Sequence, residues 1–311
     1  MRSRAAGLHD MVLALLLLAV FALSTSVPIS VSAQAPPPPP TPSPSPSPSS
    51  SPTFNVLDFG ADPTASRDSG PAVGKASLAM QQSLTGGVLY FPPGRYLMIE
   101  PLFPGQAFVN ISAETSPQGG DWVAVGAGAD QTLLFFNSEA VDAPLFAVTG
   151  GTALKTWGMG AMAVYSLPLS SPPRPQQPIL LLAGVHGSNV FDVNVASNGS
   201  LVPFASFGSS ALLFRNIYVG GSFAAAILLD DNEDVVVQNC AILGDAEQAQ
   251  KGQVGVRVTG SAQRVRILNS MFSNITTGQC ATHSALCSAL PFFQLLLFPM
   301  MNTVTLSLTF R

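Results

Sequence analysis

The sequence predicts an all-β solenoid, a parallel β-helix in which successive coils stack along one axis. The first supporting observation is that aligned segments place an asparagine at one position, at intervals of 22, 23 and 30 residues. These asparagines are Asn194, Asn216, Asn239 and Asn269. The second is that strand-like runs, AAILL at 225–229 and VGVRV at 254–258, occupy corresponding places in successive segments. A coil of about 22 residues is what three short strands and three turns require.

The asparagine column has a physical reason. Asparagine tolerates the left-handed backbone conformation of a tight turn, and stacked amides can hydrogen-bond from coil to coil. The longer interval is explained if the polar stretch GDAEQAQKGQ, residues 244–253, is a surface insertion.

The first 35 residues are predicted to be a secretory signal. Arg2 and Arg4 precede an apolar run from Met11 to Leu23, and small residues near Ala33 form a cleavage-like site. The run is shorter than the roughly 20 residues that a spanning helix needs, so no stable membrane span is expected after its removal. We therefore expect a secreted protein, extracellular or in a cell wall.

Residues 36–53 are predicted to be a Pro/Ser-rich disordered linker. The stretch PPPPPTPSPSPSPSSSP has no apolar side chain to bury and favours an extended polyproline II spacer. In composition such Ser-Pro tracts resemble the glycosylated stalks of wall glycoproteins. Three N-glycosylation sequons, at Asn110, Asn198 and Asn274, fit a secreted glycoprotein.

Composition and cysteine usage narrow the function classes. Charged residues make up 10% of the chain and the net charge is −4, so there is no basic field for nucleic acid. Secretion permits disulfides, but three cysteines are an odd number. Cys280 and Cys287 could close a short loop, which leaves Cys240 as a small buried hydrophobic residue.

Residues 54–280 are predicted to form the folded domain. The segment FNVLDFGADPTASRDSGPAVGKASLAM reads as a strand, a turn and a helix that begins near Asp68 or Ser69, with Pro71 in its first turn. A strand is expected at Val88 to Phe91, followed by a Pro-Pro-Gly turn and another strand. The glycine-rich 123–132 lacks a third glycine and a following helix, so it predicts a strand and corner, not a dinucleotide site.

Two motifs carry a family resemblance: the strand with Asp-Phe-Gly-Ala and its capped helix, and the Gly-Gly-x-x-Tyr-Phe-Pro-Pro-Gly-x-Tyr pattern that follows. They resemble the N-terminal segment of the pectate-lyase superfamily, which includes polygalacturonase-like and rhamnogalacturonase-like proteins. The resemblance implies a single-stranded right-handed parallel β-helix whose N-terminal end is capped by the α-helix. It departs from the family at Arg67-Asp68-Ser69, where a pair of aspartates is frequent. The matching residues are not catalytic ones, so no activity follows from them.

The last residues, 281–311, are apolar and interrupted by Pro291 and Pro299. This tail is either a last coil with a terminal cap or an end that replaces missing coils.

The candidate site is the acidic stretch LLDDNEDVVVQNC at 228–240. Enzymes with this architecture act on acidic polysaccharides. Hydrolysis needs a protonated carboxylic acid and a second carboxylate, roughly 6.5 to 9.5 Å apart in an inverting enzyme. Elimination needs a base and a cation, Ca²⁺ or Arg, at the uronate carboxylate. We take Asp230, Asp231 and Asp234 as the candidate carboxylates and Arg215 as their charge partner.

Each assignment has a plainer alternative. In register with the neighbouring coils, DDNED falls on turn compositions, so the acids could simply form a corner of the fold. Adjacent strand residues point to opposite faces, so Asp230 and Asp231 reach one sugar only if a turn redirects them. Arg215 could be a solvated side chain. His186, in a turn of the preceding coil, could assist one of the acids or could be catalytically inert.

No cofactor is certain from the sequence. The D-x-N-x-D run at 230–234 suggests Ca²⁺, but Val235 and Ala241 stand where a helix-loop-helix calcium site needs glycine and glutamate. The polygalacturonase set of Asn-Thr-Asp, Asp-Asp, Gly-His-Gly and Arg-Ile-Lys elements is incomplete. The sequence thus predicts a monomer that acts on or binds acidic, pectin-like polysaccharide by lyase or glycoside hydrolase chemistry. The alternative is a non-catalytic wall glycoprotein or carbohydrate-binding β-helix.

Overall fold

A computed structural model describes residues 51–83, 86–112, 121–137, 143–150, 156–167, 177–197, 202–245 and 253–275, together with the backbone of 304–309. The chain divides into two units, Met1–Ser49 and Ser50–Arg311, and the described residues belong to the second. The predicted signal, most of the predicted linker, Asn198, Cys280 and Cys287 lie outside them. Within the described residues, no helix has the length and apolarity needed to cross a membrane.

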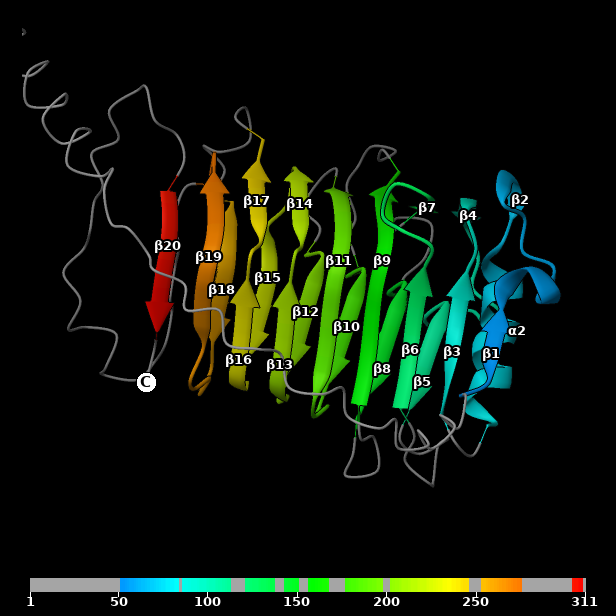
Figure 1. Ribbon diagram of the computed structural model, residues 1–311, viewed down its shortest axis with the longest axis horizontal. Helices are drawn as coiled ribbons and strands as arrows, with labels where there is room; N and C mark the ends of the chain where they lie inside the picture. The colour runs from blue at the N-terminus through cyan, green and yellow to red at the C-terminus, as the bar shows by residue number, and fades with distance from the viewer. Residues whose placement is uncertain are drawn as a thin grey trace, which may run out of the picture. The chain divides into compact units, whose positions relative to one another are not determined.

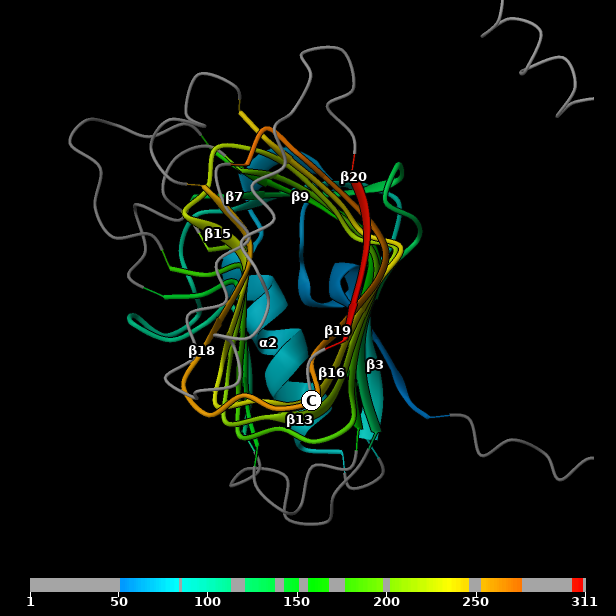
Figure 2. The ribbon, with the colours of Figure 1, turned by 90° about the vertical axis from the view of Figure 1, so that its left-hand side faces the viewer.

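The fold is a right-handed parallel β-helix, as predicted, built from two parallel sheets that face each other (Figures 1 and 2). The smaller sheet has six strands in the order β18-β15-β12-β10-β8-β5. These strands are β5 (Val109–Ser112), β8 (Phe146–Thr149), β10 (Leu180–Ala183), β12 (Phe204–Phe207), β15 (Ala225–Asp230) and β18 (Val254–Thr259). Each pairs with the strand one coil away, which is the register of a solenoid.

The larger sheet has 14 strands and bends into two arms. The first arm contains β1 (Thr53–Asn55), β3 (Gly86–Phe91), β6 (Asp121–Gly126), β13 (Ser210–Arg215) and β16 (Glu233–Gln238). The second arm contains β2 (Thr64–Asp68), β4 (Gly94–Met98), β7 (Thr132–Phe136), β14 (Tyr218–Gly221) and β17 (Ala241–Gly244). The long strands β9 (Thr156–Ser166), β11 (Ser188–Ser197) and β19 (Arg266–Ser273) run through both arms. The strand and corner predicted at 123–132 are confirmed as β6 and the turn before β7.

The bend between the arms is a column of left-handed residues, and it partly confirms the asparagine column. Asn216, Asn239 and Asn269 occupy it with φ of 53°, 53° and 49°. The preceding coil contributes Asp192, whose φ is 54°, and the prediction of Asn194 at this position is wrong. Asn194 lies two residues farther on, paired with Tyr218 in a regular strand. Aspartate shares the tolerance of asparagine for this conformation, so the intervals alone could not separate the two.

The amides of the bend column interact from coil to coil. Asn216 Nδ2 donates to Asp192 Oδ1 at 2.8 Å, and Asn239 Nδ2 donates to Asn216 Oδ1 at 3.5 Å. These contacts are the coil-to-coil amide hydrogen bonds that the column predicts, with a carboxylate at one end.

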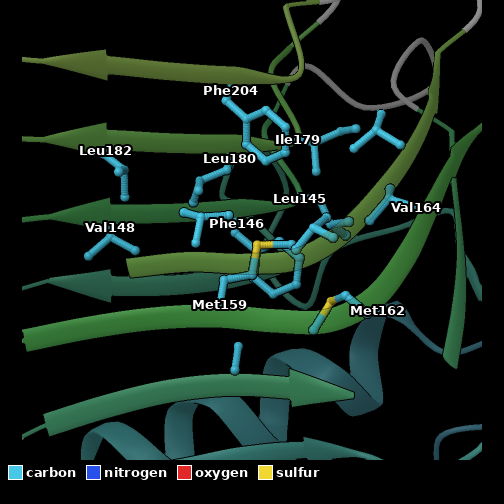
Figure 3. Close-up of a cluster of buried hydrophobic side chains, with 14 of the residues drawn as sticks. Leu145, Phe146, Val148, Met159, Met162, Val164, Ile179, Leu180, Leu182 and Phe204 are labelled. Atoms are coloured by element: carbon cyan, nitrogen blue, oxygen red, sulfur yellow. The ribbon is translucent and has the colours of Figure 1, made fainter. Parts of the chain in front are cut away.

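The core fills the space between the sheets with stacked apolar side chains (Figure 3). Along the smaller sheet, Phe146, Leu180, Phe204 and Ile227 follow one another in register from coil to coil, and all are fully or almost fully buried. Alternation along each strand sends every second residue inward, so the intervening residues form the outer faces of the sheets.

Helix α2 (Gly70–Gln81) packs against β1, β3 and β5 and against the 3₁₀ helix η1 (Val56–Phe59), near the first coils (Figure 2). Ser69 is its N-cap residue and a proline lies in its first turn, as predicted. Asp68 Oδ1 accepts hydrogen bonds from the backbone N–H of Gly70 and Ile99, so this acid joins the helix start to the next segment. The departure from the family pattern at 67–69 therefore still leaves one aspartate in a bonded position.

The turn before the helix is organised by Asp62. Its carboxylate accepts hydrogen bonds from the hydroxyl and backbone N–H groups of Thr64 and Ser66 and from the N–H of Arg67. The Ser66 hydroxyl, followed by Thr64, holds the pKa of Asp62 well below its usual range.

Strand β20 (Val304–Thr309) pairs antiparallel with β19, whereas the other pairs of the described strands are parallel. The described part of the predicted tail is therefore a strand added to the last coil in the opposite direction, not a continuation of the solenoid repeat.

Candidate functional site: an acidic corner and two outer faces

The acidic stretch forms the corner between β15 and β16. We call Asp230, Asp231, Glu233 and Asp234 the acid corner. Asp231 has φ of 53°, and the preceding coil has Gly208 at this position with φ of 55°. The following coil has Gly260, whose φ is 65°. The prediction that DDNED is a turn of the coil is confirmed.

The corner brings Asp230 and Asp231 to the same side. Asp230 Oδ1 accepts a hydrogen bond from Thr259 Oγ1 at 2.7 Å, and Asp231 Oδ1 accepts from Ser261 N at 2.6 Å and Ser261 Oγ at 2.9 Å. A Cβ on Gly260 would lie 2.7 Å from the first carboxylate and 2.2 Å from the second. The left-handed turn thus redirects Asp231, and both carboxylates lie over Gly260.

Buried Asn232 fixes the corner from inside. Its Oδ1 accepts hydrogen bonds from Ser206 Oγ and Ser209 N, both at 2.9 Å, and its Nδ2 donates to the carbonyl groups of Ser206 and Asp230. All four partners belong to the protein, so its amide is committed to the fold. The D-x-N-x-D run is therefore divided between a partly buried Asp230, a buried amide and an exposed Asp234, which does not suit a shared calcium cage. Across the described residues, no three His, Cys, Asp or Glu side chains converge as a metal-binding group.

The other two acids are bound by Arg264 of the next coil. Arg264 Nε lies 2.5 Å from Asp234 Oδ1, its Nη2 lies 2.9 Å from Asp234 Oδ2, and Nη2 also contacts Glu233 Oε1. The guanidinium thus grips Asp234 with two parallel hydrogen bonds, the bidentate geometry in which arginine binds carboxylates most strongly. Arg264 is the charge partner that the sequence reasoning did not choose, although the 30-residue interval from Asn239 to Asn269 also relates Asp234 to Arg264.

The electrostatics of Asp231 and Asp234 do not suit a general acid. Hydrogen bonds from the backbone N–H and hydroxyl of Ser261 lower the pKa of Asp231. The Arg264 hydrogen bond lowers the pKa of Asp234, and the same interaction raises the pKa of Arg264. A carboxyl group that protonates a leaving oxygen needs the opposite, a raised pKa. These two acids are held as anions.

Arg215 lies at the opposite end of the strands from the acid corner, contrary to the expectation that it would meet the acids. It pairs with Gln238 at the far end of β13 and β16, whereas the acid corner lies at the near end, where Ser210 pairs with Glu233. Its guanidinium carbon lies 5.5 Å from the ring centroid of Phe191, one coil earlier. The sequence placed Arg215 near the right strand, but only the register shows that it belongs to the opposite end.

His186 also lies beside this corner, one coil before Ser210. Its Nδ1 is 2.8 Å from Ser210 Oγ, and both side chains are at least partly exposed. Ser210 separates the imidazole from Glu233 in the column of successive coils. The histidine therefore does not bridge to the acids.

The outer face of the second arm carries exposed aromatic rings that the sequence reasoning missed. Tyr165 is 38% exposed and stacks on Phe135 of the preceding coil, with ring centroids 5.3 Å apart and planes inclined by 21°. Tyr218 is 41% exposed and lies across Gly220, since a Cβ there would be 3.0 Å from its ring atoms. Exposed Asn194 lies on β11, between the strands of the two tyrosines. We call Phe135, Tyr165, Asn194 and Tyr218 the aromatic face.

The comparisons with known proteins cover part of the chain. Residues 53–117 match a family model described as rhamnogalacturonase A/epimerase, pectate lyase-like. A search of curated proteins found no match.

Solved structures with a similar arrangement of strands share little sequence. The catalytic domain of a GH87 alpha-1,3-glucanase has a TM-score of 0.45 and 16% identity over 76% of this chain and 40% of its own. The surface adhesin PfbA of Streptococcus pneumoniae has a TM-score of 0.43 and 13% identity, covering 72% of this chain and 62% of the adhesin. An iota-carrageenase of family GH82 from A. fortis has a TM-score of 0.42 and 14% identity, covering 72% and 57%. The chain spans about two fifths of the length of the glucanase domain. Its N-terminal residues 53–117 are thus similar to pectate-lyase-like proteins of the rhamnogalacturonase and epimerase type, and the described coils form a parallel β-helix.

Proposed function

We propose that this protein binds an extended polysaccharide along the aromatic face. The observation that carries the proposal is the pair of exposed tyrosines on neighbouring parts of one parallel sheet, Tyr165 and Tyr218. Large aromatic side chains are usually turned inward, and those exposed on a rigid surface are candidates for binding. The family match at 53–117 supports a carbohydrate partner, because the matching model is described as rhamnogalacturonase A/epimerase, pectate lyase-like.

The geometry suits a chain of sugars. The strands carrying the two tyrosines are separated by β11, so their backbones are roughly 10 Å apart across the sheet, and the register offsets the two tyrosines by two residues along it. Pyranose rings present apolar C–H groups that pack on aromatic faces. The amide of exposed Asn194, placed between the rings, can donate to and accept from sugar hydroxyl groups. A sheet held rigid by its core pre-organises these groups and lowers the entropic cost of binding.

The proposal also concerns the location of the protein. The apolar run at 11–23 and the Pro/Ser spacer at 36–53 are those of a secreted chain that holds its folded domain away from an attachment point. We place the function outside the cell, on wall or matrix polysaccharide of the pectin type.

Cleavage at the acid corner is the second candidate function. It is favoured by the turn that brings Asp230 and Asp231 together over Gly260, exposed on the surface. It is disfavoured because the pKa of Asp231 is lowered and because Arg264 occupies the other two acids. Binding without cleavage therefore agrees better with the geometry.

Binding is tested by isothermal titration calorimetry of the purified protein against polygalacturonate, methyl-esterified pectin and a neutral glucan. We expect Tyr165→Ala/Tyr218→Ala to lose about tenfold or more in affinity, since an aromatic anchor is worth 1 to 2 kcal/mol or more in a typical interface. Phe207→Ala is the matched control, because Phe207 is 39% exposed but lies on the smaller sheet. Equal losses in the two variants, or no binding by the unmodified protein, would refute the proposal.

Cleavage is tested in the same mixtures by following unsaturated products in the ultraviolet and new reducing ends. We expect neither signal. A signal that disappears in Asp230→Asn/Asp231→Asn would replace the binding proposal with the enzymatic one.

A further inference from the structure

The outer face of the first arm carries a guanidinium over a ring, with Arg215 Cζ 5.5 Å from the Phe191 ring centroid. We propose that Arg215, held on this ring, binds a carboxylate group of the polysaccharide, so that the protein prefers chains that carry uronate residues. This inference rests on the proposed binding function and names the chemical class of its ligand.

The ring that supports Arg215 is itself fixed by the fold. Gly160, Phe191 and Arg215 occupy the same position on three successive coils. A Cβ on Gly160 would lie 2.5 Å from Phe191 Cε2 and 2.4 Å from the Phe191 carbonyl oxygen. The absence of a side chain at Gly160 therefore leaves room for the Phe191 ring, over which the Arg215 guanidinium lies.

The hydrogen-bonding groups of Arg215 are available to a ligand, because the side chain is exposed and its guanidinium carries five N–H donors in one plane. This arrangement matches the planar geometry of a carboxylate, which can accept two parallel hydrogen bonds. Lysine, with a compact charge on a flexible stem, could not be oriented in this way.

The charge of Arg215 is also unused within the described residues. Arg264 contacts two carboxylates, whereas Arg215 is exposed and forms no ion pair with any described side chain. The acid nearest to it in register is Asp192, which follows Phe191 and accepts a hydrogen bond from Asn216. The next coil presents the neutral Gln238 beside Arg215. A negatively charged ligand group would therefore meet the positive charge of Arg215, and the neighbouring side chain on the next coil, Gln238, is neutral.

The position of Arg215 connects it to the aromatic face. Arg215 ends β13, Asn216 forms the bend, and Tyr218 begins β14 on the other arm. The guanidinium and the tyrosine ring thus stand on either side of one bend, in the same coil. A sugar chain stacked on Tyr218 can reach Arg215 with a charged substituent, and hydroxyl groups would face the bend amides.

The test compares two polymers with the same sugar backbone, polygalacturonate and fully methyl-esterified polygalacturonate, in which neutral methyl esters replace the carboxylates. Affinities of the purified protein are measured by calorimetry at low salt and again at high salt. We expect about three- to tenfold tighter binding of the acid form at low salt, the range of a partly exposed charge-assisted contact, and a smaller preference at high salt. We expect Arg215→Gln to abolish the preference while binding the ester as the unmodified protein does.

Two further variants separate charge from orientation. Arg215→Lys keeps the charge and Phe191→Leu keeps an apolar residue, and each removes the stacked geometry. Both should retain only part of the preference, with unchanged circular dichroism spectra. A preference that survives in Arg215→Gln, or equal binding of the two polymers by the unmodified protein, would overturn the inference and leave the binding function intact. No binding of either polymer would refute both.

Discussion

Asn232 is the side chain on which the geometry of the acid corner depends, and Asn232→Ala is the sharpest test of that geometry. It is 1% exposed and forms four hydrogen bonds, with Ser206, Ser209 and the carbonyl group of Asp230. Its partner Ser209 is bonded in turn to the coil that precedes it, because Val185 N donates to Ser209 Oγ at 3.2 Å.

Truncation to alanine leaves buried groups without partners. The Ser209 N–H and the Ser206 carbonyl lose their bonds to the amide, and each unsatisfied buried group costs about 1 to 3 kcal/mol. The Ser206 hydroxyl can rotate to another partner, and the Asp230 carbonyl keeps its hydrogen bond from Gly208 N at 2.9 Å. We therefore expect a loss of about 3 kcal/mol in the free energy of unfolding. For a domain of this size that corresponds to a melting temperature lower by roughly 10 °C.

The loss is measured by thermal and urea unfolding followed by circular dichroism. Asn194→Ala is the control, because Asn194 is exposed on a regular strand and should change stability by less than about 0.5 kcal/mol. If Asn232→Ala were as stable as Asn194→Ala, the amide would not hold the corner, and the placement of Asp230 and Asp231 over Gly260 would lose its basis.

Three further predictions concern the same corner. Gly260→Ala should destabilise the protein by about 1 to 2 kcal/mol more than Gly105→Ala, since both glycines have positive φ but only Gly260 would place a Cβ against a carboxylate; melting temperatures of the two variants decide this. The folded pKa of Asp231 lies below its ordinary value of 3.8, so its contribution to stability is present above about pH 4 and is lost as the pH falls through the lowered pKa. Asp231→Asn should therefore flatten the acid side of the stability profile, and an unchanged profile would contradict the Ser261 hydrogen bonds. Arg264→Ala should lower the melting temperature only slightly, and the loss should shrink with added salt, because the ion pairs are exposed; a large, salt-independent loss would show that the guanidinium has a packing role.

The repeat of the solenoid was readable because its left-handed bend restricts the residue type. Asn216, Asn239 and Asn269 stand at the bend as predicted, and the 30-residue interval also relates Asp234 to Arg264, a pairing that the sequence analysis did not draw. The error at Asn194 arose because Asp192 satisfies the same backbone requirement, and the pattern of side chains was too short to choose between them.

The candidate site was less readable than the fold. The density of acidic residues in the sequence identified the acid corner. The alternation of side chains along a strand suggested that Asp230 and Asp231 point to opposite faces of the sheet. The left-handed conformation of Asp231 brings them together instead. Proximity in sequence suggested Arg215 as the partner of the acids, but register places it at the other end of the strand.

The sequence by itself determined the coil length, the N-terminal capping helix and the corner at 230–234, because turn residues and apolar periodicity act locally. Only the tertiary structure decided which side chains meet. Tyr165 on Phe135, Arg215 on Phe191 and Arg264 on Asp234 are contacts between residues 24 or more positions apart, and each depends on the exact stacking of neighbouring coils. A shift of one residue in strand register would turn such side chains to the other face, and the surfaces proposed to bind polysaccharide would not form.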